Sequence, residues 1–347
     1  MLSFLQPQAD LTAKNTLALP ARAEWLAPID AIAQLAAIAH SPEWARQPRF
    51  VLGGGSNLVL SGELPGITLA IALKGRAKLA EDADAHYLAA AAGENWHDFV
   101  GWTLREGCPG LENLALIPGT VGAAPVQNIG AYGREAGEFI DHLDAFDMES
   151  GEMCRFDRAN CAFGYRQSVF KREGCQNGRH VITRVVFRLP KRWQPCVAYS
   201  ELAAELARRG KAEKRQTPLD VAAAVMALRR KKLPDPAILP NAGSFFQNPA
   251  VSAALAAALG SIHPTLPRYP QADGSVKLAA GWLIEQVGWK GRNLGRVGMY
   301  EQQALVLVNR GGATASDVRN LARAVREAVF ARFGVHLELE PVQAGKA

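Results

Sequence analysis

The sequence has few cysteines, and they form no pattern that would pair them or place them around a metal. The five residues are unevenly spaced, include no Cys-x-x-Cys and do not accompany the seven scattered histidines. We therefore expect reduced thiols with packing roles, no disulfide framework and no metal site. The cysteines are Cys108, Cys154, Cys161, Cys175 and Cys196.

Long hydrophobic runs are absent as well. No stretch approaches the roughly 18 to 20 uninterrupted apolar residues that cross a bilayer. Residues 1–17 lack a basic segment followed by an apolar one and a small-residue cleavage site. These observations predict a cytoplasmic protein with no membrane partner.

The sequence also lacks three motifs that often carry phosphate or serine chemistry. No Gly-x-Gly-x-x-Gly opens a helix after a strand, and no Gly-x4-Gly-Lys-Ser/Thr is present. These two absences exclude the Rossmann and Walker interpretations. A Gly-x-Ser-x-Gly turn is missing too, so a serine hydrolase is weakly supported.

Charge is present in slight basic excess. The 39 Lys+Arg and 33 Asp+Glu give a net charge of +6 and a pI near 9.1, which suits an anionic partner. Nucleic acid usually requires a dense basic stripe interleaved with aromatic residues, and none is seen. The short basic run 229–232 ends a predicted helix, where cations also complement the helix dipole. We expect no nucleic-acid partner.

A chain of 347 residues with 48% hydrophobic residues is long enough for two or three domains. Strand and helix patterns alternate at first, strands dominate from about residue 141, and the proline-rich stretch 233–241 suggests a boundary before a third unit. The periodicities predict helices over 29–40, 94–107, 217–232 and 314–333, and strands within 50–60 and over 67–73, 86–93, 180–190, 304–309 and 335–341.

Two glycine-rich segments stand out. Residues 113–133 hold four glycines and two prolines with no charged side chain, and GGGSN occupies 53–57. Consecutive backbone N–H groups in such segments form concave anion sites that suit a diphosphate. By itself 53–57 is more typical of a plain turn. In the longer segment, the amides of Gln127 and Asn128 add donors and acceptors of the kind that bind a heterocycle.

Three further segments place polar groups in apolar surroundings. Arg166, between aromatic residues, suits either a ligand carboxylate or phosphate or an ordinary ion pair. Ser244 lies between a glycine and two phenylalanines, a small hydroxyl in a dry setting. In 335–341 the alternation puts Glu338 and Glu340 on one face, which by itself is typical of a solvated strand.

A set of long motifs together resembles the UDP-N-acetylenolpyruvoylglucosamine reductase family. The resemblance extends from about Asn15 to Glu340, nearly the whole chain. The family reduces an enolpyruvyl sugar nucleotide in the second committed step of peptidoglycan precursor synthesis. The motifs are PGTVGAAPVQNIGAYG, FGYRQSVFK, KLPDP, NAGSFFQNP, YPQADGSVKLAAGWLIEQ and QQALVLVN.

The resemblance implies an α+β fold. A two-part FAD-binding module of the vanillyl-alcohol oxidase type would span 1–74, joined by 335–347, and 75–228, and an α/β substrate-binding domain would span 229–334. FAD would be bound without a covalent bond, by bare main chain and amides, which explains the lack of charge in 113–133. The residues implied to bind it are Leu52, Gly53, Gly54, Gly55, Ser56, Asn57, Pro118, Gly119, Thr120, Gly122, Ala123, Ala124, Gln127, Asn128, Gly130 and Ala131.

The family's three catalytic residues match Arg166, Ser244 and Glu340 here. They correspond to the arginine at the substrate carboxylate, the proton donor and a residue that helps to stabilise the intermediate. The family commonly ends its last strand Leu-Glu-Pro-Glu-Val, whereas this chain reads Leu-Glu-Leu-Glu-Pro-Val. The displaced proline makes Glu338 a rival of Glu340. A second departure is Tyr300, where a histidine often stands.

The remaining implications concern ligands. NADPH would donate the hydride, UDP-N-acetylglucosamine enolpyruvate would be the substrate, and the protein would be a monomer. Tyr269 would act as a lid over the nucleotide. Tyr199 and Tyr269 together mark a subgroup of the family whose substrate domain has an extra tyrosine-bearing loop. The implied substrate or NADPH contacts are Tyr199, Lys232, Asn248, Tyr269 and Gln303.

Two other functions remain open from the residues alone. A related FAD-dependent oxidase would share the cofactor module and pass electrons to oxygen, and many such enzymes attach the flavin through a histidine. Neither glycine segment contains a histidine. A non-enzymatic binder of nucleotide sugars or nucleic acid would account for the basic pI and would be colourless when purified.

Overall fold

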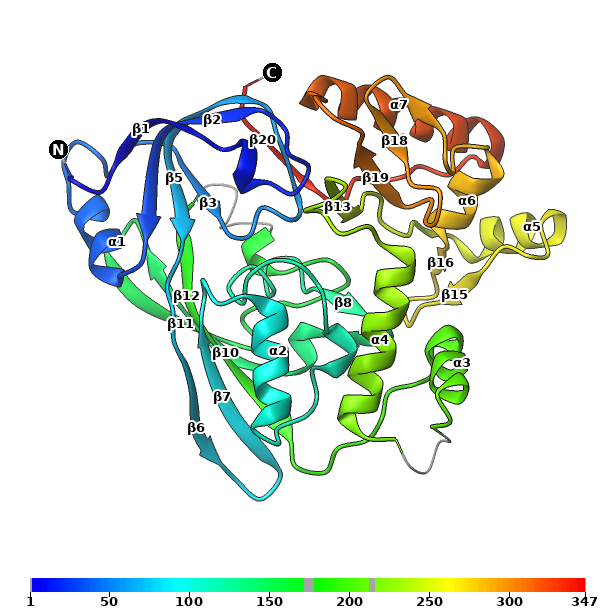
Figure 1. Ribbon diagram of the computed structural model, residues 1–347, viewed down its shortest axis with the longest axis horizontal. Coiled ribbons are helices and arrows are strands. Elements are labelled where there is room, and N and C mark those ends of the chain that lie inside the picture. The colour runs from blue at the N-terminus through cyan, green and yellow to red at the C-terminus, as the bar shows by residue number, and fades with distance from the viewer. Residues whose placement is uncertain (1, 172–177, 212–215, 347) are drawn as a thin grey trace. The chain divides into compact units, whose positions relative to one another are not determined.

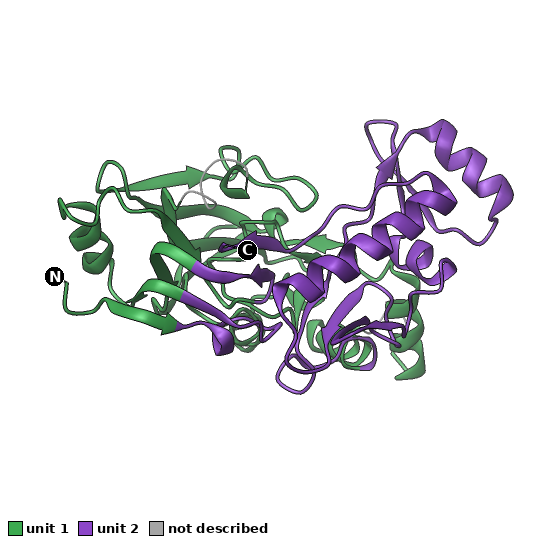
Figure 2. Ribbon diagram, turned by 90° about the horizontal axis from the view of Figure 1, so that it is seen from above, with its two compact units in different colours: residues 1–9, 23–55, 64–230 green, residues 10–22, 56–63, 231–347 purple. Residues whose placement is uncertain are grey.

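The computed structural model describes residues 2–171, 178–211 and 216–346, which belong to two compact units (Figure 2). Unit 1 is built from residues 1–9, 23–55 and 64–230, and unit 2 from 10–22, 56–63 and 231–347. Cys175 lies outside the described residues, and the four other cysteines are free thiols. None of the described helices is long and apolar enough to cross a membrane.

The main sheet of unit 1 is antiparallel and has the order β11-β10-β12-β7-β6 (Figure 1). Its central strand β12 buries the consecutive residues Val185–Phe187, and the arginines on either side of them, Arg184 and Arg188, are exposed. Strand formation over the predicted stretch 180–190 is therefore confirmed. The five strands are β6 (Arg76–Glu81), β7 (Ala85–Ala91), β10 (Ile140–Asp147), β11 (Glu152–Asp157) and β12 (His180–Pro190).

Helix α2 (Trp96–Arg105) packs its apolar face into the core of this sheet. The Asn95 side chain caps the helix by accepting from the Asp98 N–H at 3.0 Å, and Gly107 follows it with a φ of 70°. Helix α4 (Pro218–Lys232) begins after Thr217, whose hydroxyl accepts from the Asp220 N–H at 3.2 Å. The sequence analysis predicted both helices, over 94–107 and 217–232, and the structure confirms them.

A second sheet has the order β1-β2-β5-β3, with β3 and β5 parallel. Helix α1 (Ile32–Ala39) buries Leu35 and Ile38 against apolar residues of this sheet. The predicted helix 29–40 starts later than expected because Ile29 belongs to β2. The four strands are β1 (Gln6–Asp10), β2 (Ala21–Ile29), β3 (Arg49–Leu52) and β5 (Gly62–Ile71).

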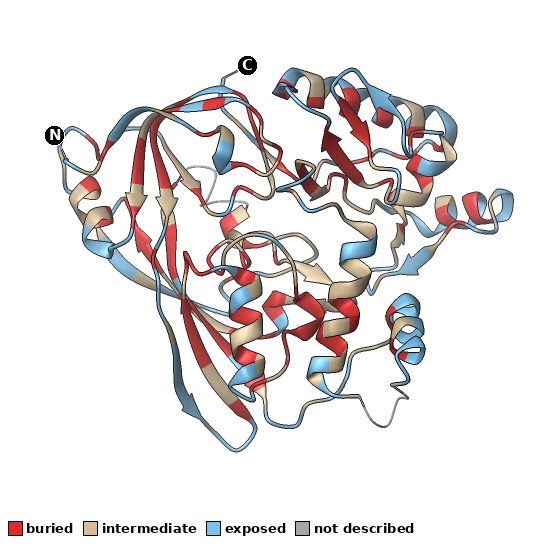
Figure 3. Cartoon of the chain, in the orientation of Figure 1, coloured by how far each residue is buried: buried red, intermediate tan, exposed pale blue. Residues whose placement is uncertain are grey.

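Unit 2 has a small antiparallel sheet of order β13-β19-β18-β17, and β18 and β19 are buried along their whole length (Figure 3). Helix α7 (Ala315–Phe333) packs on the same core, starting at the Thr314 cap and ending at Gly334, as predicted. The other members are α5 (Ala253–Ile262), α6 (Ala280–Gln286), β13 (Asn241–Ser244), β14 (Ala250–Val251), β15 (Arg268–Pro270), β16 (Val276–Leu278), β17 (Asn293–Leu294), β18 (Val297–Met299) and β19 (Val306–Asn309).

The predicted strand 335–341 is wrong in extent. Only Leu339 makes a β-bridge there, with Phe246, and the regular pairing begins after Pro341. Proline has no N–H to donate, so the ladder is interrupted at that point. Strand β20 (Val342–Ala344) then pairs in parallel with β4 (Leu58–Leu60).

The remaining elements are short. Helix α3 (Ser200–Arg208) belongs to unit 1, as do β8 (Gly130–Ala131) and β9 (Arg134–Glu135). The described residues also form three single turns of 3₁₀ helix: η1 (Thr12–Lys14), η2 (Glu112–Leu114) and η3 (Ala136–Glu138).

Candidate active site

The uncharged segment 118–131 is held by main-chain pairing to the turn between β7 and α2. The Val121 N–H donates to the Glu94 carbonyl at 2.9 Å, and the Gly122 N–H to the Ala92 carbonyl at 2.9 Å. A Cβ added to Gly122 would lie 2.4 Å from the Ala92 Cβ. Glycine is therefore required at 122 because two backbones approach closely.

The two glycine-rich segments meet in unit 1. A Cβ added to Gly54 would lie 2.8 Å from the Cα of Gly119, and one added to Gly53 would lie 3.0 Å from the Thr120 hydroxyl oxygen. Gly55 has a φ of 64°, so the loop turns sharply as it leaves β3. Bare main chain from both segments is thus gathered in one place, an arrangement that fits an anionic dinucleotide.

The first residue of the bend into this segment is fixed by two side chains. Leu116 has a φ of 62°, a conformation that leucine rarely adopts. Its N–H donates to His97 Nδ1 at 3.1 Å, and its carbonyl accepts from Arg229 Nε at 3.2 Å. Burial lowers the pKa of His97, and the guanidinium groups of Arg229 and Arg230 act in the same direction.

His97 and Arg229 were not among the site residues predicted from the sequence. His97 lies in α2 and Arg229 in α4, and nothing in their spacing indicates that both bind the backbone of Leu116. Burial lowers the pKa of Arg229 and, at Tyr132 nearby, raises the pKa of the phenol to about 12. Both residues are half-buried.

Arg166 lies on a tight turn at the edge of the same segment. The Gly164 and Gln167 backbones exchange two hydrogen bonds, of 3.0 and 3.1 Å, across Tyr165 and Arg166. Arg166 has a φ of 54° and donates from Nη2 to the Gly130 carbonyl at 3.1 Å. The sequence motifs around 128 and 166 therefore form one structural element.

The side chain of Asn128 is directed into the protein. Asn128 is 2% exposed, and its amide makes three hydrogen bonds to Glu135, Gly164 and Gly137. Binding of FAD by Asn128 stays a prediction. Because the side chain is engaged inside the protein, the main chain of Asn128 is the part left to contact the cofactor.

Ser244 ends β13 in unit 2, at an irregularity in the pairing with β19. Gly243 before it has a φ of 66°, and Phe245 and Phe246 after it are each 1% exposed. The expected dry setting is present, although Ser244 itself is half-buried. Within the described part of the chain, its hydroxyl makes no hydrogen bond, which leaves that group available to a ligand.

Glu340 lies next to the Ser244 segment through main-chain pairing. Its N–H donates to the Phe245 carbonyl at 3.0 Å, and its carbonyl accepts from Asn57 Nδ2 at 3.2 Å. Glu340 is half-buried, whereas Glu338 is exposed. Glu340 is thus the less exposed of the two rival carboxylates, and its choice over Glu338 stays a prediction.

Comparisons with known proteins agree with this geometry. Residues 27–157 match the family model of the FAD binding domain, and 235–344 match that of the UDP-N-acetylenolpyruvoylglucosamine reductase C-terminal domain. A protein named UDP-N-acetylenolpyruvoylglucosamine reductase from Azoarcus sp. (strain BH72) is 58% identical, over 96% of each chain. One of the same name from Dechloromonas aromatica (strain RCB) is 56% identical, over 96% of this chain and 97% of that one.

The chain belongs to the UDP-N-acetylenolpyruvoylglucosamine reductase family. Its fold is similar to the crystal structure of UDP-N-acetylenolpyruvylglucosamine reductase (MurB) from Thermus caldophilus, with a TM-score of 0.68 at 24% identity. That match covers 99% of this chain and 100% of the Thermus caldophilus chain. The family resemblance and the mixed fold class expected from the sequence are confirmed.

The family's implied substrate residues are divided between the units. In unit 2, Asn248 Oδ1 accepts from the Ala280 N–H at 3.0 Å at the start of α6, and Gln303 lies in the turn before β19. Tyr269 is 47% exposed on β15, and Lys232 is the last residue of α4. In unit 1, the ring of Tyr199 packs edge-on against Tyr132 at 5.5 Å. Their ligand contacts remain predictions.

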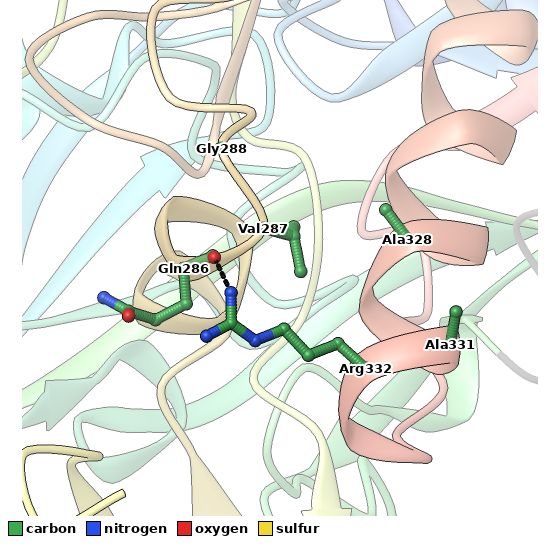
Figure 4. A pocket seen from close by; sticks show the side chains of 6 residues that line it. All are labelled: Gln286, Val287, Gly288, Ala328, Ala331 and Arg332. Atoms are coloured by element: carbon green, nitrogen blue, oxygen red, sulfur yellow. Dashed lines mark hydrogen bonds between the residues drawn. The ribbon is translucent and has the colours of Figure 1, made fainter.

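An open hollow of about 530 Å³ lies in unit 2 between the end of α6 and α7 (Figure 4). Arg332 donates to the Gln286 carbonyl across it. Its other lining residues are small or apolar, and none of the predicted site residues takes part. The hollow therefore shares no residue with the candidate active site.

Proposed function

We propose that the protein reduces UDP-N-acetylglucosamine enolpyruvate to UDP-N-acetylmuramate, with NADPH as hydride donor and bound FAD as carrier. The observation that carries the proposal is the pairing of the Ser244 segment with Glu340, in a chain that shares 58% identity with a reductase of this family. The reaction supplies peptidoglycan precursors. We also propose that the protein is a cytoplasmic monomer and that its product is needed for cell shape and cell division.

The residues that would hold FAD are the main chains of 52–57 and 118–131. The close approach of Gly54 to Gly119 leaves no room for side chains between them, and the segment 113–133 has no carboxylate to repel a diphosphate. When bound, FAD supplies a carrier that accepts hydride from NADPH and delivers it to the enolpyruvyl double bond.

Hydride addition to the terminal carbon leaves negative charge on the carbon that bears the substrate carboxylate. Arg166 is suited to bind that carboxylate, because its guanidinium is planar and always charged. Ser244 would then donate its proton to the carbon. A hydroxyl is a weak acid in water, but the carbanion is a very strong base, so correct placement of the hydroxyl matters more than its acidity.

Glu340 would assist the same step. A protonated Glu340 can donate a hydrogen bond to the developing negative charge, whereas an ionised one would oppose it. Its backbone is fixed on both sides, by Phe245 and by Asn57. This support is what a carboxyl group needs in order to act at one defined position.

The test is to purify the protein, record its flavin spectrum and measure NADPH consumption with and without the enolpyruvyl substrate. We expect a yellow protein whose flavin is released on denaturation and whose NADPH consumption depends on the substrate. A colourless folded protein would contradict the proposal. Flavin retained on the precipitated protein, with oxygen as the acceptor, would favour an oxidase instead.

A further inference from the structure

The glycine segment and the Arg166 turn are joined by alternating contacts along 126–130. The Val126 carbonyl accepts from the Ser168 hydroxyl, Asn128 Nδ2 donates to the Gly164 carbonyl at 3.1 Å, and the Gly130 carbonyl accepts from Arg166. Each of these contacts is between residues far apart in the sequence. The position of the Arg166 turn therefore depends on three side chains rather than on a strand ladder.

Asn128 makes the central contact of this set. One of its N–H groups reaches the Gly164 carbonyl and the other the Glu135 carboxylate at 2.7 Å, while its Oδ1 accepts from the Gly137 N–H at 2.7 Å. An amide is the one short side chain that can donate twice and accept once in this way. Replacing it by a carboxylate would also place two negative groups together.

The turn needs such support because its conformation is unfavourable. Arg166 has a φ of 54° and Asn128 a φ of 46°; asparagine tolerates this left-handed backbone, but arginine seldom adopts it. Lys171 Nζ adds a hydrogen bond of 3.0 Å to the Arg166 carbonyl. Without these bonds the turn would relax, and the guanidinium would lose its defined position.

We propose that Asn128 is a positioning residue that acts through Arg166, rather than through a side-chain contact with the cofactor. This inference rests on the proposed function, since it assigns Arg166 to the substrate carboxylate. Its consequence is that the side chain of Asn128 serves the half-reaction with the enolpyruvyl substrate and is dispensable for reduction of the flavin by NADPH.

The experiment compares N128A, R166K and the double variant, with N95A as a control that removes another asparagine hydrogen bond in unit 1. We expect N128A to retain FAD and normal reduction by NADPH, and to lose about 10-fold or more in kcat/KM for the enolpyruvyl substrate. In the R166K background, N128A should add less than about 2-fold, because residues that act through one group are not additive.

Hydrogen exchange supplies a readout that is independent of activity. Amides of 163–171 should exchange faster in N128A and at the wild-type rate in N95A, because Asn128 donates to the Gly164 carbonyl whereas the Asn95 side chain accepts from the Asp98 N–H. Should N128A not fold, S168A tests the other end of the turn with the same expected pattern.

Additive losses in the double variant, or loss of FAD with unchanged exchange in 163–171, would overturn the role of Asn128. Failure of the proposed function looks different: wild-type protein would then not reduce the enolpyruvyl substrate at all, while the exchange experiment would still report on the turn.

Discussion

The candidate site residues form two groups, the first in unit 1 and the second in unit 2, and each group is held in place by different means. In unit 1, Leu116, Asn128, Tyr132 and Arg166 all have positive φ, and side chains hold several of these turns. In unit 2, the Ser244 segment is fixed by backbone pairing with β19 and with Glu340. Side-chain substitutions in the first group, in unit 1, should therefore disturb the geometry of the backbone. Substitutions in the second group, in unit 2, should remove a reactive side chain and leave the fold intact.

The sharpest test of the second group is Ser244→Ala. The backbone of Ser244 makes the structural contacts, so we expect little change in thermal stability. Reduction of the flavin by NADPH should be nearly intact, and reoxidation by the enolpyruvyl substrate should slow by about 10²- to 10⁴-fold. Stopped-flow absorbance of the flavin measures both halves. Equal losses in the two half-reactions would remove Ser244 from the role of proton donor.

Glu340→Gln and Glu338→Gln form a matched pair in the same segment. Glutamine keeps a neutral N–H donor but lacks the more acidic O–H of a carboxyl group, so we expect a loss of about 10-fold in kcat for Glu340→Gln, less than the about 10²-fold cost of removing such a group. Glu338 is exposed, so its variant should remain within about 2-fold of wild type. Steady-state NADPH oxidation distinguishes them. A larger loss of kcat in Glu338→Gln than in Glu340→Gln would mean that Glu338 is the third catalytic residue.

Gly122→Ala tests the first group, where backbone contact is tightest. The added Cβ would lie 2.4 Å from the Ala92 Cβ, so the segment has to move away from the turn after β7. We expect a loss of about 1–3 kcal/mol in the free energy of unfolding, together with weaker FAD binding. Urea unfolding and flavin release measure the two effects. Gly133→Ala, next to Tyr132 in the same region, is unsuitable as a control because Gly133 has a φ of 82°.

The smallest effect is expected for His97→Asn. Burial lowers the pKa of His97 below the ordinary value of 6.5, so the unfolded chain binds a proton more readily than the folded one as the pH falls. Stability from this group is complete above about pH 6.5 and decreases below it. Asparagine keeps an acceptor for the Leu116 N–H and does not titrate. Unfolding measured from pH 8 to 5 should show a weaker acid loss in the variant, and identical curves would contradict this role of His97.

Much of the fold was predictable because local signals and burial agree. The caps at Asn95, Thr217 and Thr314 and the stop at Gly334 define helices without reference to the rest of the chain. The predicted strand 335–341 was wrong because alternation shows which side chains are buried, as at Leu337, but not whether a neighbouring strand is present to pair with.

The candidate site was less predictable for a related reason. The lack of charge in 113–133 indicates bare main chain, and the meeting of Gly54 with Gly119 agrees with that. His97 and Arg229 give no such signal, because their common partner is a carbonyl and an N–H of Leu116 that any residue would offer. The inward role of the Asn128 amide likewise depends on tertiary contacts with 135–137 and 164.

The parallel pairing of β20 with β4 has a consequence for synthesis of the chain. Leu58–Leu60 leave the ribosome long before Val342–Ala344, and at about 5–20 residues per second the delay is roughly 15 to 60 s. Throughout that interval an apolar Leu-Val-Leu edge has no partner strand, while the sheet of residues 76–190 is already complete. The apolar Leu58–Leu60 segment therefore waits for its partner strand until almost the whole chain has been made.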